Sequence, residues 1–331
     1  MRKILSFLRI VISAALLAAL IWMMKDQLSD IGAIIITANK FLIALSIALI
    51  ITGMIIQSYR LKFLLDAQEI HLSIKDIIRL TFMGHFFNNF MPTAIGGDVI
   101  KGYFVSGGTK KKLETYASIA IDRMLGVITL MWIALVAIAF NYSKLRNKLV
   151  ILIIAVIFIA GILFTALIFN ERAARFFLFL KKALRKFKLD EKMQRLYEAT
   201  NNYRHHKALI FKALWLSLAA QLVYFFVIYI LGVSISGYVP FMFFMLILPL
   251  ISTVSMLPSI NGLGIRESGF IYFLGDAMGR EKAFALSLLY LGAILFISLI
   301  GGVLFLINKE FNHIQVVPRP ETPVGGDTLL R

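Results

Sequence analysis

Two short stretches combine helix-breaking residues with ionised side chains inside a largely apolar chain. The first covers residues 88–101 and the second covers residues 257–267. Each contains a proline, a small hydroxyl residue, glycines, and an acid with a base beside it or three residues away. Non-helical backbone at membrane depth is tolerated only where protein buries it or water fills a cavity. We therefore predict that the two stretches are the tips of two broken helices that face one shared site.

The residue types at these tips suit the binding of an anion. A half-helix that begins at the tip directs its unpaired N–H groups and the positive end of its dipole into the membrane centre. Nearby lysine and arginine side chains add positive charge, and a lipid phosphate is the anion most available at that depth. The acids neutralise these bases when the site is empty, or accept an ammonium or a sugar hydroxyl from the headgroup. The candidate headgroup-binding residues are Asn88, Asn89, Pro92, Gly96, Gly97, Asp98, Lys101, Asp122, Arg123, Pro258, Asn261, Gly262, Gly264, Arg266 and Glu267.

Each of these features also has a purely structural interpretation. Asp98 could cap a half-helix, and Asp122 with Arg123 could form a pair that reaches the membrane interface. Arg266 and Glu267 could form a buried ion pair that fixes its hairpin. The glycines could serve close helix packing alone. The sequence leaves these interpretations open beside the binding site.

The composition indicates a membrane protein of the all-α class. Apolar residues make up 60% of the 331 residues, the mean hydropathy is +0.84, and charged residues make up 16%, against roughly 25% in soluble domains. The chain has no cysteine, which excludes a disulfide or a thiolate metal site. The five histidines show no ligand spacing, and His85 is interpreted as a polar helix contact. We predict no metal, no cofactor and no catalytic residue.

The formal net charge of +17 is concentrated between the apolar spans. That distribution is typical of a positive-inside membrane protein that contacts anionic lipid, and it argues against a nucleic-acid partner. It places both termini in the cytoplasm and predicts a multi-pass protein of the inner (cytoplasmic) cell membrane.

Runs of about 20 apolar residues predict a helical bundle with six full spans. After the first break, only about ten residues remain before a basic turn, which is about 15 Å of helix and half a bilayer. We therefore predict two re-entrant hairpins, residues 77–106 and 240–278. A short linker is expected at residues 25–40. The six spans are residues 4–24, 41–65, 115–140, 149–170, 208–232 and 281–307.

The order of these elements predicts an inverted-topology repeat. Span, span, hairpin and span occur in residues 1–140 and again in residues 141–307, and each half crosses the membrane an odd number of times. The second half includes a basic segment, residues 171–207, interpreted either as an amphipathic surface helix or as an ordinary cytoplasmic loop. Residues 308–331 are expected to form a disordered cytoplasmic tail.

These residues resemble the lysylphosphatidylglycerol synthase transmembrane region, a flippase-like domain family that also occurs without the aminoacyl-transfer domain. Lys101 stands where arginine is common in the family, which retains the charge but loses the planar fork. The chain ends soon after the last span, so the resemblance implies lipid translocation or lipid handling rather than lysyl transfer. The matching pieces are Asn88-x-Phe90-x-Pro92, Gly96-Gly97-Asp98-x-x-Lys101, Asp122-Arg123-x-x-Gly126 and Leu257-Pro258-x-x-x-Gly262-x-Gly264-x-Arg266-Glu267.

The first functional hypothesis is a membrane lipid translocase, which moves an anionic, aminoacylated or polyprenyl-linked headgroup between leaflets through a polar cavity at the midplane. One alternative is an integral-membrane transferase or hydrolase with Asp98 or Glu267 as base. Another is a partner subunit that presents lipid to a separate lipid-modifying enzyme. The partners considered are therefore an anionic phospholipid or polyprenyl-phosphate lipid, such an enzyme, and a second copy of the chain.

Overall fold

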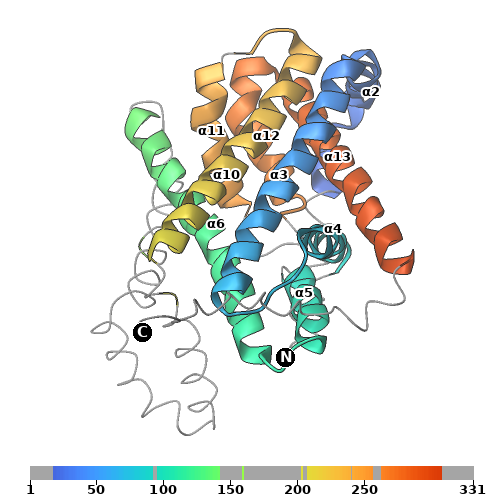
Figure 1. Cartoon of the computed structure of the whole chain (residues 1–331). Helices are drawn as coiled ribbons and strands as arrows, with labels where there is room; N and C mark the ends of the chain where they lie inside the picture. The colour runs from blue at the N-terminus through green and yellow to red at the C-terminus, as the bar shows by residue number, and fades with distance from the viewer. Residues whose placement is uncertain are drawn as a thin grey trace, which may run out of the picture.

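The computed structural model describes residues 18–91, 95–141, 159, 203, 207–239, 241–255 and 262–307. Every element within these ranges is a helix, as the all-α prediction requires (Figure 1). The elements are η1 (Lys25–Gln27), α2 (Leu28–Thr37), α3 (Lys40–Ala67), α4 (Ile74–Phe90), α5 (Gly96–Gly107), α6 (Lys112–Asn141), α10 (Lys207–Ser236), α11 (Phe241–Val254), α12 (Ile265–Met278) and α13 (Arg280–Ile307).

Four helices in the described part of the chain are long and apolar enough to cross a membrane. They are α3, α6, α10 and α13, and they coincide with the predicted spans 41–65, 115–140, 208–232 and 281–307. The chain is therefore a multi-pass helical membrane protein. The other two predicted spans, 4–24 and 149–170, lie largely outside the described residues. The basic segment 171–207 and the tail 308–331 lie almost wholly outside them.

Helices α3 and α10 pack along one another in the middle of the bundle (Figure 1). The backbone N–H of Asn39, before α3, donates to the carbonyl of Ser234 near the end of α10. Arg60 near the end of α3 instead donates to Ser217 near the start of α10. The two helices are therefore antiparallel. A Cβ atom added at Gly53 of α3 would lie 3.6 Å from Val223 of α10, an ordinary van der Waals contact.

Each predicted hairpin contains two short helices that pack against each other. Helices α4 and α5 fall on the predicted hairpin 77–106, and α11 and α12 fall on the predicted hairpin 240–278. In the first pair the backbones touch, because a Cβ atom on Gly97 would overlap the carbonyl oxygen of Gly84. At least one of the glycines therefore serves close helix packing.

Helix α4 also packs closely against α13, the last helix of the described chain. A Cβ atom on Gly301 would overlap the backbone carbonyl of Phe82, and one on Gly302 would overlap the ring of Phe86. Small residues at such contacts let two helix backbones approach each other in a membrane.

We expect Gly301→Ala to lower the free energy of unfolding by about 1–3 kcal/mol, because the added methyl group meets rigid backbone of α4 and overpacks the contact. Gly292→Ala is the matched control on the same helix, since no neighbouring atom lies within 4 Å of the position that its Cβ would occupy. The control is expected to be neutral or stabilising by about 0.5–1 kcal/mol. Thermal unfolding in detergent measures both, and equal midpoints for the two variants would contradict the contact.

The segment predicted as a short linker, residues 25–40, is mostly helical. The structure has the short helix η1 and then α2 there, and α2 packs against α13. Apolar residues three and four apart form the contact: Ile31 is buried, and Ile34 and Ile35 pack beside it against Phe284. Apolar residues at this spacing form one face of a helix, and burial of that face favours a helix here despite the charged residues around it.

Candidate functional site

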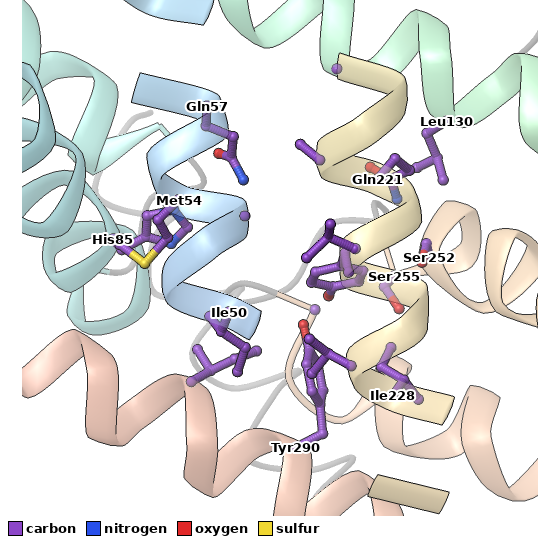
Figure 2. A pocket seen from close by; sticks show the side chains of 18 of the residues that line it. Ile50, Met54, Gln57, His85, Leu130, Gln221, Ile228, Ser252, Ser255 and Tyr290 are labelled. Atoms are coloured by element: carbon purple, nitrogen blue, oxygen red, sulfur yellow. The ribbon is translucent and has the colours of Figure 1, made fainter. Parts of the chain in front are cut away.

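A cavity of about 440 Å³ lies between the long helices, with both hairpins at its wall. The residues that line it on α3 run from Leu49 to Arg60, the middle of a helix that extends from Lys40 to Ala67. Its lining on α10, α6 and α13 also comes from the central turns of each helix. The cavity therefore occupies the central layer of the bundle. Figure 2 shows it between α3 and α10, with the side chains of Gln57 and Gln221 on its two sides.

The first hairpin contributes the end of α4 to this cavity. His85 and Asn89 line it, and the Asn89 amide donates to the hydroxyl of Ser298 on α13. The neighbouring Asn88 faces the start of α5, where its side-chain oxygen accepts a hydrogen bond of 2.8 Å from the N–H of Gly97. That bond satisfies one of the unpaired donors at the helix start. Asn88 thus fixes the turn, whereas Asn89 lies at the cavity wall.

The second hairpin contributes Gly262 and the first turn of α12. Gly262 and Gly264 have φ of 79° and 82°, a left-handed backbone that glycine adopts without strain. Glu267 is fully buried. Its carboxylate accepts a hydrogen bond of 2.6 Å from the N–H of Gly264 and one of 2.7 Å from Nη2 of Arg266. The Arg266 guanidinium lies 5.1 Å from the ring centre of Tyr290, a cation–π distance. Arg266 therefore lines the cavity with its carboxylate partner behind it.

Residues 122 and 123 of α6 point to different partners. Asp122 accepts two hydrogen bonds from the guanidinium of Arg60, at 2.6 and 3.0 Å, and Nη1 of Arg60 donates to Ser217. Arg123 instead forms an ion pair with Asp98 at the start of α5. Neither interaction matches the structural alternative in which Asp122 and Arg123 form an interfacial pair. Helix α6 thereby connects α3 and α10 on one side to the first hairpin on the other.

The cavity lining is asymmetric in charge. Three arginines, Arg60, Arg123 and Arg266, line it, and no aspartate or glutamate of the described residues does. The three carboxylates that pair with these arginines, Asp122, Asp98 and Glu267, are absent from the lining. Much of the lining is apolar, and its charged part is positive and supplies hydrogen-bond donors, which favours an anion at that part of the cavity.

The structure brings some of the predicted residues to the cavity, whereas other described ones do not line it. Lys101 lies against Gly84, with its ammonium 3.8 Å from Asp98. Pro92, Pro258 and Asn261 lie outside the described residues. The predicted residues that line the cavity are Asn89, Arg123, Gly262 and Arg266; those that do not are Asn88, Gly96, Gly97, Asp98, Lys101, Asp122, Gly264 and Glu267.

Several polar lining residues were not predicted from the sequence. Arg60 is 6% exposed, and its guanidinium pairs with Asp122. Gln57 and Gln221 project from the two central helices, and Tyr290 carries a buried hydroxyl that hydrogen-bonds to no described residue. A detectable signal was present, because amide and guanidinium groups are costly in the middle of apolar spans and mark pathways or sites.

Comparison with known proteins agrees with this description. The family model for the lysylphosphatidylglycerol synthase TM region matches residues 6–302. A curated relative, the "UPF0104 membrane protein PH1989" of Pyrococcus horikoshii, is 27% identical over 335 residues, which cover 92% of this chain and 97% of that protein. No solved structure matches the chain.

Proposed function

Since the chain belongs to the family of the lysylphosphatidylglycerol synthase transmembrane region, we propose that it is a lipid translocase that passes a phosphate-containing headgroup through the central cavity. Membership of this family supports a role that involves membrane lipid. The cavity supplies the specific argument, because three arginines and no described carboxylate line a space at the centre of a membrane bundle. A phosphate group is the anion that such a lining suits best.

We propose that the two hairpins are re-entrant. Helix α5 has 12 residues and α12 has 14, so at about 1.5 Å per residue they extend only about 18 and 21 Å. Both are shorter than the roughly 30 Å of a hydrocarbon core. Each therefore reaches part of the way through the bilayer and leaves its first turn near the cavity.

We further propose that residues 1–140 and 141–307 are inverted repeats. Supporting this, helix contacts occur in matched pairs: α4 of the first half packs on α13 of the second, and α11 of the second packs on α6 of the first. Figure 1 has α5 at one end of the bundle and α11 and α12 at the other. With basic loops inside, the first hairpin enters from the cytoplasm and the second from the opposite side.

In the proposed mechanism the headgroup occupies the cavity while the acyl or prenyl chains stay in lipid. Rocking of the two halves opens the cavity to one leaflet and then to the other, as in transporters built from inverted repeats. Arg123 is 43% exposed at its side chain and is paired with Asp98 across the boundary between α5 and α6. In our proposal it meets the phosphate first and passes it toward Arg266.

The test is lipid exchange in liposomes that contain the full chain and a fluorescent phosphatidylglycerol, followed by chemical quenching of the outer leaflet. We expect exchange well above that of protein-free liposomes. Arg123→Gln should slow it by about tenfold or more, the loss expected when one charge-assisted hydrogen bond is removed. Arg79→Gln is the matched control, because Arg79 is similarly exposed at 48% and also pairs with one aspartate, but lies outside the cavity lining.

Exchange equal to that of empty liposomes for the wild-type chain would contradict the translocase. Equal slowing by Arg79→Gln and Arg123→Gln would contradict the cavity route. Analysis of the lipid after the assay separates the translocase from the transferase or hydrolase, because only an enzyme changes the lipid covalently.

A further inference from the structure

The neutral polar side chains of the lining, and the absence of described acids from it, determine which lipid headgroups the cavity can bind. Gln57 and Gln221 lie on opposite sides of the cavity, and neither amide hydrogen-bonds to a described residue (Figure 2). Unpaired amides are costly in a membrane interior unless a ligand or water completes them. Ser252 and Ser255 add hydroxyl groups to the lining on the side of Gln221 (Figure 2). These groups are suited to a neutral partner that both donates and accepts, such as a polyol.

The ionised groups at the cavity set the net charge of a matching ligand. Three separate groups of ion pairs lie at the lining or next to it: Arg60 with Asp122, Arg266 with Glu267, and Arg123 with Asp98, which also pairs with Lys101 outside the lining. Counted over these described groups with all of them ionised, four bases face three acids, which leaves one excess positive charge. A phosphodiester carries one negative charge and balances it.

An ammonium group, by contrast, has no anionic partner in the cavity. Both carboxylate oxygens of Asp122 accept hydrogen bonds from the Arg60 guanidinium. Glu267 is fully buried and accepts hydrogen bonds from Arg266 and from the Gly264 N–H. Asp98 pairs with Arg123 and is absent from the lining. A cationic headgroup would therefore approach three arginines without meeting a carboxylate of the described chain, and like charges at close range are strongly unfavourable.

We propose that the cavity selects a phosphodiester with a neutral, hydroxyl-bearing substituent and rejects a headgroup that carries an ammonium. This inference rests on the proposed function and narrows it, since the aminoacylated class is removed from the three headgroup classes considered. The same chemistry occurs in phosphatidylglycerol and in a polyprenyl-phosphate sugar. In both, the phosphate meets the arginines and the hydroxyls meet the two glutamines.

The test measures binding and needs no transport. The full chain in detergent is mixed with equal amounts of phosphatidylglycerol, lysyl-phosphatidylglycerol and phosphatidylethanolamine, and native mass spectrometry reports the bound lipid. We expect phosphatidylglycerol to bind at least about tenfold more tightly than either amine-bearing lipid. A second arm replaces phosphatidylglycerol with a polyprenyl-phosphate mannose, and the tighter of the two identifies the source of the shared chemistry.

A charge introduced into the cavity provides the decisive variant. Gln221→Glu keeps the shape of the side chain and places a carboxylate at the lining, so we expect the preference to shift by about tenfold toward lysyl-phosphatidylglycerol. Gln221→Met is the control, because it removes the amide without adding charge, and it should weaken phosphatidylglycerol without favouring the lysyl lipid.

The binding test can fail or succeed independently of the liposome test of the translocase. Equal binding of phosphatidylglycerol and lysyl-phosphatidylglycerol by the wild-type chain, or no shift with Gln221→Glu, would overturn the selectivity even if lipid exchange occurs. A clear preference for the polyol phosphodiester, together with absence of exchange in liposomes, would retain the selectivity and overturn the translocase.

Discussion

Replacing Arg266 by methionine is expected to abolish lipid exchange and to destabilise the protein. Arg266 is 6% exposed and its partner Glu267 is fully buried. The substitution leaves the carboxylate with the Gly264 N–H as its hydrogen-bond donor among the described residues. Removing one partner of a buried ion pair costs about 3–5 kcal/mol, because the other charge remains unpaired. Thermal unfolding in detergent and liposome exchange measure the two effects.

A double variant separates stability from function. Arg266→Met with Glu267→Gln removes both charges and retains a side-chain oxygen for the Gly264 N–H. Replacing a whole buried pair by neutral groups is often close to neutral for stability. We therefore expect the double variant to recover most of the unfolding midpoint while lipid exchange stays absent. Normal exchange in this variant would assign Arg266 a purely structural role in the hairpin.

The pair of Arg60 and Asp122 is expected to give the second large effect. Asp122→Asn leaves the Arg60 guanidinium buried, with Ser217 but without its bidentate carboxylate, which we expect to cost about 3–5 kcal/mol. The matched control is Asp66→Asn. Asp66 pairs with Lys62 on the same helix as Arg60, but the two side chains are 27% exposed, so the loss should be about 1 kcal/mol or less.

The measurement is again the unfolding midpoint of each variant in one detergent. Arg60→Met combined with Asp122→Leu removes the whole pair and should be more stable than Asp122→Asn alone. If Asp122→Asn and Asp66→Asn lower the midpoint equally, the central ion pair does not stabilise the bundle.

The places where the short helices begin and end could be predicted because the signals are local. Proline and glycine near residues 92–97 and 258–264 interrupt apolar runs, and the helices of the structure begin and end next to them. The buried pair of Arg266 and Glu267 was among the structural alternatives, and adjacent residues at a helix start could be paired from sequence alone.

The partners of Arg60, Asp122 and Arg123 could not be predicted in the same way. Arg60 stands 62 residues before Asp122 and 157 before Ser217, so only the packing of α3, α6 and α10 brings them together. Arg60 also ends an apolar run, where a base is ordinarily interpreted as an interfacial anchor. A search for polar side chains within predicted spans would have found Gln57 and Gln221 as well.

The close backbone contact between α4 and α13 has a consequence for how the protein is made. The ribosome completes α4 about two hundred residues before α13 emerges, a separation evident from positions 82 and 301. Until α13 is made, α4 lacks the neighbour whose Gly301 lies against the Phe82 carbonyl, and Asn89 lacks Ser298 as a hydrogen-bond partner. A nascent chain that stops before residue 280 would leave exposed the face of α4 that α13 covers in the finished protein.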